Sequence, residues 1–293
     1  MKHAFCQSAL LALFACGPAF AAVSATDDAG HTVTLAAPAK RIVSLAPHVT
    51  ELLFAAGAGG RVVGAVEYSD YPPAAKKVPR VGDNRQLDLE RIAALKPDLI
   101  VVWRHGNAGK QLARLQTLNI PLYYSDPQTL GAVPGAVERL GVLAGSEAEA
   151  RAAAQGYRQR LDALTRRYQG RDKLLVFYQV WDKPLYTLNA HTIASDAIRL
   201  CGGVNVFGTL PVTAPVVSEE AVLAVRPEVI VSGASRPQDD AFARWRRYPS
   251  LAAVRAGNLL AIDADLLSRA GPRAIAGAEQ LCAALDTARA RRR

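Results

Sequence analysis

Aromatic side chains gather where the apolar runs of this sequence end. Tyr68 and Tyr71 follow one short run in "EYSDYPP", Trp103 ends "DLIVVW", and Trp181 ends "VFYQVW". If these runs are parallel strands, their carboxyl ends form the edge at which open α/β sheets bind ligands. Flat amphipathic rings at that edge suit a large, partly apolar ligand with polar edges. The alternative at each position is a ring that only covers the local core.

Three histidines, His48, His105 and His191, also lie near the ends of such runs. Together with Asp265 or Glu67 they supply the residue types of a metal site. Their spacing contains no local metal-binding motif such as two histidines four residues apart. A metal site is therefore one open interpretation, and histidines in solvated loops are the other.

The sequence motifs of nucleotide binding and hydrolysis are missing. "GAGGRVVG" has Val62 where a dinucleotide-binding fingerprint needs its third glycine, and it follows a helical pattern rather than a strand. No Walker sequence and no G-x-S-x-G turn occurs, and the spacing of serine, histidine and aspartate favours no catalytic triad. Nothing in these patterns indicates an enzyme.

The first 21 residues have the pattern of a secretory signal peptide. A basic start precedes the apolar run "ALLALFACGPAFA", which ends in Ala-Phe-Ala. This run is far shorter than the roughly 20 residues that span a bilayer. We expect cleavage after Ala21 and export of residues 22–293 to the periplasm. The alternative is lipid anchoring at Cys16, although Phe14 fits a lipoprotein signal poorly.

Two of the four cysteines lie inside this signal, which leaves Cys201 and Cys282 in the exported chain. In an oxidising compartment two lone cysteines are most simply a disulfide, and two buried thiols are the alternative. Closing a loop of this length would stabilise the fold by about 4 kcal/mol.

The formal net charge is +9, and the chain ends in "ARARRR". Elsewhere basic residues alternate with acids, as in "DLERIAALKPD", and no basic stretch carries the interleaved aromatics that bind single-stranded nucleic acid. We therefore expect a solvated basic surface and no nucleic acid partner.

Short apolar runs rich in valine and isoleucine alternate with helical patterns, which is typical of parallel strands joined by crossover helices. One long helical pattern covers 146–168, where Ser146 and Glu149 form a capping box. A helix of this length runs about 34 Å, long enough to join lobes at 22–145 and 169–293 as a brace. The predicted strands are 41–45, 62–66, 99–103, 122–125, 174–180, 229–232 and 259–262.

The stretch "ALKPDLIVVW" has an echo 130 residues later in "AVRPEVIVSG", and extending the match backwards pairs Glu90 with Glu220. A weaker echo pairs "TELLFAAG" with "SDAIRLCG", in which Thr50 and Ser195 are expected to cap a helix that ends at a glycine. A repeat of this length indicates two similar lobes rather than a solenoid. We predict an α/β fold of two Rossmann-like lobes with central parallel sheets, joined by one long rigid helix, with a ligand between them.

Several stretches resemble the periplasmic cobalamin-binding proteins that feed ABC importers: "RIVSLAPHVTELLFAAGAG", "YSDYPP", "LDLERIAALKPDLIVVWRHGN", "LCGGVNVF", "RAGPR" and "AEQLCAAL". The resemblance covers residues 41–285, and 68–107 resembles the cobalamin branch of the wider class of substrate-binding proteins with a helical backbone between two lobes. It implies a monomeric, non-enzymatic protein without a cofactor. Such a protein captures cobalamin between its lobes and delivers it to the permease subunits of an importer.

The resemblance also assigns roles to nine residues, as transporter-docking glutamates, ligand-contacting side chains and a disulfide pair. In that order they are Glu90 and Glu220; Tyr68, Trp103, Trp181, Asp265 and Arg269; and Cys201 and Cys282. Within the ligand set, the tyrosine and the first tryptophan are expected to lie against the corrin. The aspartate and the arginine are expected to be polar cleft residues of the second lobe.

The sequence departs from this family at four positions. Asn84 and Ala214 stand where the best-known members have tryptophans, and Leu266 and Leu267 replace aromatics. Each lost ring removes stacking worth about 1 to 2 kcal/mol. We therefore expect weaker cobalamin binding or a different preferred corrinoid. Two other hypotheses stay open, a heme or ferric-siderophore binding protein of the same class, and an exported metal-dependent enzyme that uses the three histidines.

Overall fold

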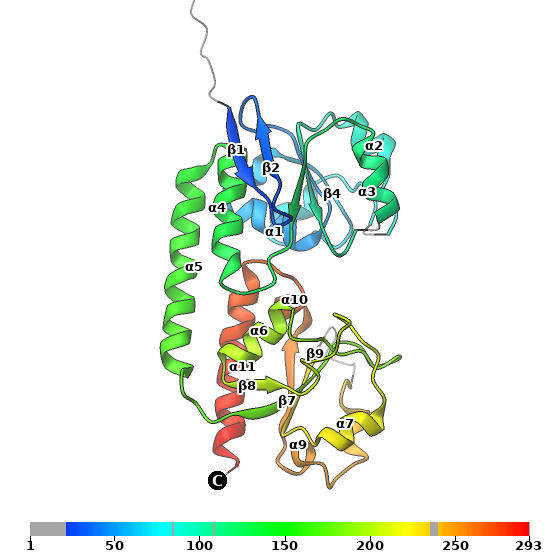
Figure 1. Ribbon diagram of the computed structural model, residues 1–293, viewed down its shortest axis with the longest axis vertical. Coiled ribbons are helices and arrows are strands. Elements are labelled where there is room, and N and C mark those ends of the chain that lie inside the picture. Colours follow the sequence, from blue (N-terminus) through cyan, green and yellow to red (C-terminus); the bar gives the residue numbers. More distant parts are fainter. Residues whose placement is uncertain (1–21, 84, 108, 235–239, 293) are drawn as a thin grey trace, which may run out of the picture.

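The computed structural model of the protein describes residues 22–292 except 84, 108 and 235–239. The expected signal peptide, Cys16 and Asn84 lie outside the described residues. Two four-stranded parallel sheets organise the chain (Figure 1). We call the part around the first sheet the N-terminal lobe and the part around the second sheet the C-terminal lobe.

Both sheets have the same strand order. The first reads β4-β3-β5-β6 and the second β8-β7-β9-β10, so each sheet has its second strand at one edge, followed by the first, third and fourth. All seven predicted strands are present with ends that shift by at most two residues, which confirms the α/β fold with parallel sheets. The bounds are Ile42–Ser44 (β3), Val62–Ala65 (β4), Leu99–Trp103 (β5), Leu122–Ser125 (β6), Leu174–Gln179 (β7), Gly203–Asn205 (β8), Val229–Ala234 (β9) and Leu259–Asp263 (β10).

Three strands were not predicted. One is the short edge strand β8, and the others form an antiparallel hairpin, Val23–Thr26 (β1) with Thr32–Leu35 (β2). The hairpin strands are four residues long and half polar, so they lack the continuous apolar run of the central strands. Val23, Ala25 and Val33 pack against the core of the N-terminal lobe, and this tertiary contact holds the hairpin.

Helices cover both sheets, and α5, with 22 residues, is the longest in the described part of the chain (Figure 1). It runs alongside both lobes and packs against α4 and α11. No helix of the described ranges is both long and apolar enough to cross a membrane. The helices are Pro47–Ala55 (α1), Leu89–Ala94 (α2), Gly109–Gln116 (α3), Ala132–Ala144 (α4), Glu147–Tyr168 (α5), Ile193–Leu200 (α6), Glu219–Val225 (α7), Ala243–Arg246 (α8), Ala252–Arg255 (α9), Ala264–Leu267 (α10) and Arg273–Ala290 (α11), with 3-10 turns at Gly59–Arg61 and Pro73–Lys77.

One apolar core continues from one lobe to the other. It includes Val101 of β5, Leu161 of α5, Val176 of β7 and Ile275 of α11, all buried. Close-packed side chains of this kind resist separation because every gap forfeits dispersion contacts. The shared core therefore opposes a wide hinge motion between the lobes.

Three predicted side-chain caps are wrong, although α5 does start directly after Ser146 as predicted. Ser146 does not cap α5, because its hydroxyl donates a hydrogen bond of 2.6 Å to the carbonyl of Ala56. Thr50 lies inside α1, since Pro47 already occupies the first turn, where proline is favoured. Ser195 lies inside α6, three residues after the residue whose side chain caps that helix. Each hydroxyl has a partner in the fold that the local pattern does not reveal.

The glycines predicted at the helix ends are confirmed. Gly57 follows α1 and Gly202 follows α6, with φ angles of 76° and 77°. This is the left-handed region that glycine adopts without steric cost. At Gly57 a side chain would also clash with α5, because its Cβ would lie 2.9 Å from the Cβ of Glu149.

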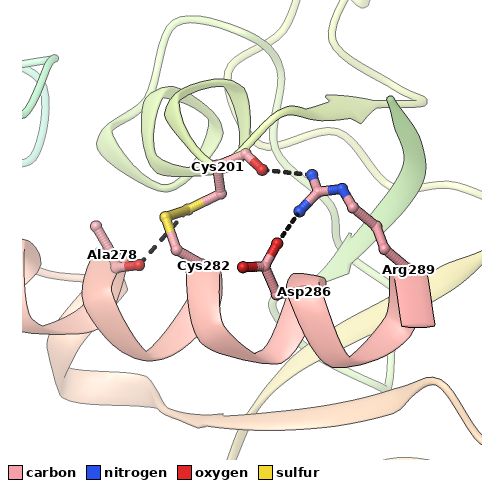
Figure 2. The surroundings of a disulfide bond; sticks show 5 residues. All are labelled: Cys201, Ala278, Cys282, Asp286 and Arg289. Carbon is pink, nitrogen blue, oxygen red and sulfur yellow. Dashed lines mark hydrogen bonds and ion pairs between the residues drawn. A yellow bond between two sulfur atoms is a disulfide. The ribbon is translucent and has the colours of Figure 1, made fainter. Parts of the chain in front are cut away.

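Cys201 and Cys282 form the predicted disulfide (Figure 2). It joins the end of α6 to α11, and both cysteines are fully buried. Next to it, Arg289 donates to the carbonyl of Cys201 at 2.6 Å and to the carboxylate of Asp286 at 2.8 Å. The disulfide therefore cross-links elements of the C-terminal lobe only.

Candidate functional site

The carboxyl ends of the parallel strands of the N-terminal lobe form one edge, where four side chains gather. His48 lies in α1 just after β3, Tyr68 follows β4, Trp103 ends β5, and Asp126 follows β6. Parallel strands bring these ends to the same side of the sheet, which is where open α/β sheets bind ligands. This edge is the N-terminal half of the candidate site.

Trp103 is the most firmly held of these side chains. Its indole nitrogen donates to Asp126 at 3.0 Å, and its ring meets the His48 ring edge-on with centroids 5.2 Å apart. Its backbone nitrogen donates to the side chain of Asn107 at 2.7 Å. Gly106 lies flat against the ring, since a Cβ there would come within 1.7 Å of it. The indole is therefore preorganised at the strand end.

His48 is a buried neutral imidazole beneath this indole. Burial lowers its pKa to about 4, although the charge of Asp126 and a hydrogen bond to the backbone of Ser125 act in the opposite direction. Its Nε2 atom has no hydrogen-bond partner among the described residues. The ring therefore stays uncharged at neutral pH.

The three histidines do not form a metal site. His105 pairs through Nδ1 with the carboxylate of Asp126, and His191 is exposed in the C-terminal lobe. Within the described ranges no group of three or more histidine, cysteine, aspartate or glutamate residues is arranged to hold a metal ion. The structure gives no support to the hypothesis of a metal-dependent enzyme.

Two of the predicted ligand-contacting rings are free at the surface. Tyr68 is 75% exposed and has a left-handed φ of 63°, and Trp181, just after β7, is 61% exposed. Tyr71 is also exposed, whereas Trp103 is half-buried. A left-handed backbone is uncommon for a tyrosine and clusters at functional sites. Each lobe therefore presents an exposed aromatic ring beyond the carboxyl end of one of its strands.

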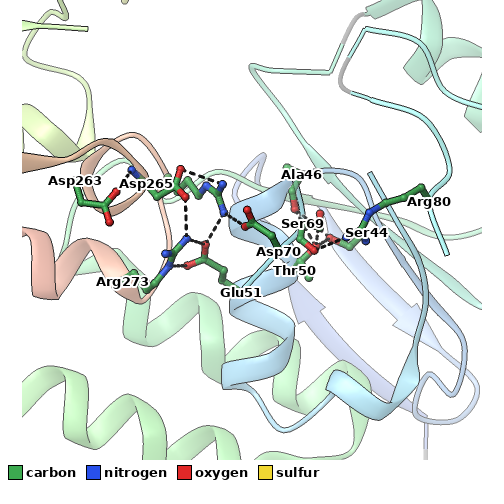
Figure 3. Close-up of polar contacts among 11 residues, drawn as sticks. Ser44, Ala46, Thr50, Glu51, Ser69, Asp70, Arg80, Asp263, Asp265 and Arg273 are labelled. Atoms are coloured by element: carbon green, nitrogen blue, oxygen red, sulfur yellow. Dashed lines mark hydrogen bonds and ion pairs between the residues drawn. The ribbon is translucent and has the colours of Figure 1, made fainter. Parts of the chain in front are cut away.

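The lobes meet in a cluster of ion pairs that includes Asp70, two residues after Tyr68, and we call it the junction cluster (Figure 3). From the C-terminal lobe it contains Asp265, Arg269 and Arg273, and from the N-terminal lobe it contains Glu51 of α1 and Asp70. Arg273 donates two hydrogen bonds, of 2.7 and 3.0 Å, to the carboxylate of Glu51. Contacts between α1 and the segment after β10 bring the carboxyl ends of both sheets toward the same junction.

Arg269 has most of its donor capacity occupied. It lies 2.7 Å from Asp70, 3.0 Å from Asp265 and 3.3 Å from Glu51, and its side chain is only 11% exposed. Burial alone would raise the pKa of Asp70, but the hydrogen bond and charge of Arg269 outweigh it and lower that pKa. The junction cluster is therefore a charged contact between the lobes, in which Asp70 stays ionised at neutral pH.

Of the predicted polar residues, the junction cluster contains Asp265 and Arg269 but adds three that the sequence did not indicate. These are Glu51, Asp70 and Arg273. Glu51 is easily read as a first-turn acid of a surface helix, yet its side chain is 2% exposed. Its partners are more than 200 positions away, so no local pattern reveals them.

The two predicted docking glutamates occupy equivalent, exposed positions. Glu90 is the second residue of α2, and Glu220 is the second residue of α7. Glu90 lines a surface hollow of about 600 Å³, and Glu220 lines one of about 440 Å³. Hydrogen bonds from its own backbone nitrogen and from the hydroxyl of Ser218 lower the pKa of Glu220. Both hollows therefore have an exposed glutamate carboxylate at a helix start.

The departures from the family lie in different surroundings. Leu266 and Leu267 are buried, and Leu267 belongs to the shared core beside Gly277. They therefore do not line the candidate site as exposed substitutes for the missing aromatics. Ala214 is exposed in the segment before α7.

Comparisons with known proteins agree with this architecture. A family model described as "Periplasmic binding protein" matches residues 42–266. The curated vitamin B12-binding protein of Vibrio cholerae serotype O1 is 39% identical over 255 residues, which cover 86% of this chain and 91% of that protein. This match agrees with the resemblance to periplasmic cobalamin-binding proteins.

Solved structures of other proteins also match this architecture. The crystal structure of the periplasmic vitamin B12-binding protein BtuF of Vibrio cholerae has a TM-score of 0.81 and 38% identity, covering 86% of this chain and 98% of that one. A periplasmic heme-binding protein of Pseudomonas aeruginosa has a TM-score of 0.73 and 27% identity, covering 84% and 92%. The matched family consists of binding proteins, which confirms the prediction that the chain is not an enzyme. The chain belongs to the periplasmic binding protein family.

Proposed function

We propose that this protein captures cobalamin or a related corrinoid between its two lobes and passes it to an ABC importer. The observation that carries the proposal is the 39% identity to a vitamin B12-binding protein along 86% of the chain. Exposed rings at Tyr68 and Trp181 support it, because a large, flat, partly apolar ligand gains most from aromatic surface on both of its sides. Trp103 and Asp265 complete the proposed ligand set, together with Arg269.

Heme or a ferric siderophore is the second candidate. The similarity to a heme-binding protein of Pseudomonas aeruginosa favours it, as does the presence of tyrosine and histidine side chains at the same strand ends. Cobalamin and heme both contain a large flat ring that suits aromatic side chains, so exposure of the rings alone does not separate them.

Calorimetric titration of the chain from residue 22 onward, with cyanocobalamin, hemin and a ferric siderophore in parallel, tests the proposal. We expect one-to-one binding of cyanocobalamin in the submicromolar range, which corresponds to about −8 kcal/mol or stronger. Binding of hemin or the siderophore alone would replace cobalamin with the second candidate.

A matched pair of variants locates the ligand. Trp181 lies just beyond the carboxyl end of β7, and Leu175 lies near the amino end of the same strand, and both are exposed. Trp181→Ala should weaken cyanocobalamin binding about tenfold, since it removes a stacking ring. Leu175→Ala should leave the affinity unchanged. Equal effects of the two variants would contradict the proposed position of the ligand.

We also propose that Glu90 and Glu220 dock the loaded protein onto basic side chains of the permease. Their equivalent positions on the two lobes, each in an open hollow, support contact with a two-fold partner. Glu90→Ala with Glu220→Ala should reduce vesicle uptake but leave ligand affinity intact. Asp162→Ala, which removes an exposed carboxylate of α5, is the control. A parallel loss of ligand affinity would show that the glutamates act on ligand binding instead.

Family membership implies a periplasmic location. We further propose that residues 1–21 are removed on export, that the mature protein is a monomer, and that it carries no cofactor of its own. Intact mass spectrometry and light scattering of the exported protein test these points. A lipid-modified chain beginning at Cys16 would contradict cleavage after Ala21.

A further inference from the structure

The short segment that carries Tyr68 is attached to both lobes. It follows β4 and continues through Ser69 and Asp70, which Figure 3 shows, to Tyr71. The Tyr68 side chain is 75% exposed, so packing restrains it only weakly. Its position therefore depends on how the next three residues are held.

Within the N-terminal lobe, a chain of buried hydroxyls holds Ser69. Thr50 of α1 donates to the Ser69 hydroxyl at 3.0 Å, and the Ser44 hydroxyl lies 2.8 Å from that of Thr50. All three side chains are fully buried. Arg80 donates to the Ser69 carbonyl at 2.9 Å. This anchor explains why the hydroxyl of Thr50 is not available as a helix cap.

From the C-terminal lobe, two arginines hold the following two residues. Arg269 donates to Asp70 at 2.7 Å, and the Arg273 guanidinium lies 4.3 Å from the centroid of the Tyr71 ring. Both arginines are themselves bonded to Glu51, the neighbour of Thr50 in α1. Thr50 of α1 therefore anchors the segment directly, and its neighbour Glu51 anchors it through the two arginines of the C-terminal lobe.

From these contacts we infer that Asp70 is a positioning residue for ligand capture, which fixes the Tyr68 ring through its bond across the lobes to Arg269. The inference rests on the proposed function, because it requires that Tyr68 contacts the ligand. A charge-assisted hydrogen bond is short and directional, so it limits the conformations of a segment of four residues more than packing at an exposed site can. A binding surface that is already ordered before the ligand arrives loses less conformational entropy on binding. Asp70 thus contributes to affinity without touching the ligand.

A double-mutant cycle with cyanocobalamin, measured by calorimetry, tests the inference. Asp70→Asn should weaken binding about tenfold, as expected for loss of one charged hydrogen bond that preorganises the site. Tyr68→Ala should weaken it at least as much. In the Tyr68→Ala background, Asp70→Asn should have no further effect, because its target is gone. Asp70→Glu, which keeps the charge, should restore part of the affinity.

Three outcomes would overturn the inference. Unchanged affinity of Asp70→Asn would show that the bond does not position the ring. Additive losses in the double variant would show that Asp70 acts independently of Tyr68. Tighter binding by Asp70→Asn would show that Asp70 competes with the ligand for Arg269. Glu138→Gln, which weakens an exposed ion pair with Arg158 between α4 and α5, is the control and should not change affinity.

The same double-mutant cycle distinguishes a failure of this inference from a failure of the proposed function. If the unaltered protein binds cyanocobalamin but the variants do not show the expected affinities, the positioning role of Asp70 is wrong and the proposed function stands. If the unaltered protein does not bind cyanocobalamin, both fail together. Thermal melting of each ligand-free variant shows whether an affinity loss is accompanied by loss of the fold.

Discussion

The same helix-turn-strand unit occurs once in each lobe, as α2 with β5 and as α7 with β9. Each helix begins after a capping side chain that accepts a backbone hydrogen bond, at 2.9 Å for Asp88 and 3.2 Å for Ser218. Each turn contains one residue in the left-handed region, Lys96 with φ 46° and Arg226 with φ 47°. The two units agree in backbone conformation although their sequences match only weakly.

The acid after each turn also has the same role in both lobes. Asp98 accepts from the backbone nitrogens of Lys40 and Arg41 at 2.9 and 3.0 Å, just before β3. Glu228 accepts from the backbone nitrogen of Leu175 at 2.9 Å, at the start of β7. In each lobe the acid therefore joins its own strand to the strand beside it.

The side chains around these units differ. Position 89 is a leucine in the N-terminal lobe, whereas the equivalent Glu219 bonds Tyr248 at 2.8 Å and forms an ion pair with Arg244. The C-terminal lobe also has the disulfide, whereas the N-terminal lobe has a buried histidine at its strand ends. The repeat has therefore kept the residues that the backbone needs, whereas each lobe is stabilised by its own set of side chains.

Removing the disulfide should give the largest change and should affect the C-terminal lobe. Cys201→Ser with Cys282→Ser frees a loop of 81 residues and should lower the free energy of unfolding by about 4 kcal/mol in the chain-entropy model. Urea denaturation measures this loss in the free energy of unfolding. Hydrogen exchange should become faster first in β9 of the C-terminal lobe rather than in β5 of the N-terminal lobe. A loss below about 1 kcal/mol would mean that α6 and α11 hold together without the bond.

Acid should weaken the N-terminal lobe through His48. Its pKa is lowered from 6.5 to about 4 in the folded protein, so between these values the unfolded chain binds the additional proton. The stabilisation is complete above about pH 6.5 and is lost as the pH falls toward 4, by up to about 3 kcal/mol. His48→Asn should remove this pH dependence, whereas His191→Asn, at an exposed site, should not. A pH profile unchanged by His48→Asn would contradict the assignment.

Matched substitutions at the two strand-joining acids should cost smaller and unequal amounts. Asp98→Ala should lower the free energy of unfolding by about 1 to 2 kcal/mol and Glu228→Ala by about 1 kcal/mol, because the aspartate accepts two backbone hydrogen bonds and the glutamate accepts one. Urea denaturation of both variants checks the order. A larger loss at Glu228 would show that its ion pair with Arg292 outweighs the backbone bond.

Glycine at the two left-handed positions should have the smallest effect, and the same effect in both lobes. Lys96→Gly and Arg226→Gly should each raise the free energy of unfolding by about 0.5 kcal/mol, since relief of the strained φ slightly exceeds the entropy that glycine adds to the unfolded chain. Arg114→Gly in α3 is the control and should destabilise by about 1 kcal/mol. Opposite signs at the two turns would show that the lobes are less alike than their backbones.

The central strands could be predicted from the sequence with little error. Leu99–Trp103 and Leu122–Ser125 have the predicted bounds, because four to eight apolar residues between turn signals have few other stable conformations. The hairpin β1–β2 could not be predicted, since its strands are short and are held by packing against the core. The caps at Thr50 and Ser146 were wrong because each hydroxyl bonds a partner from another element.

The parallel strands, the repeat and the remaining cysteine pair follow from the sequence alone, because they depend on local composition, on spacing and on a count. The junction cluster follows only from the folded structure. Glu51, Asp70 and Arg273 are ordinary surface residue types, and a charge pattern cannot say which distant charge each one will meet. An ion pair between lobes forms where packing of the shared core brings the carboxylates and guanidinium groups together, and that geometry exists only once both lobes have folded.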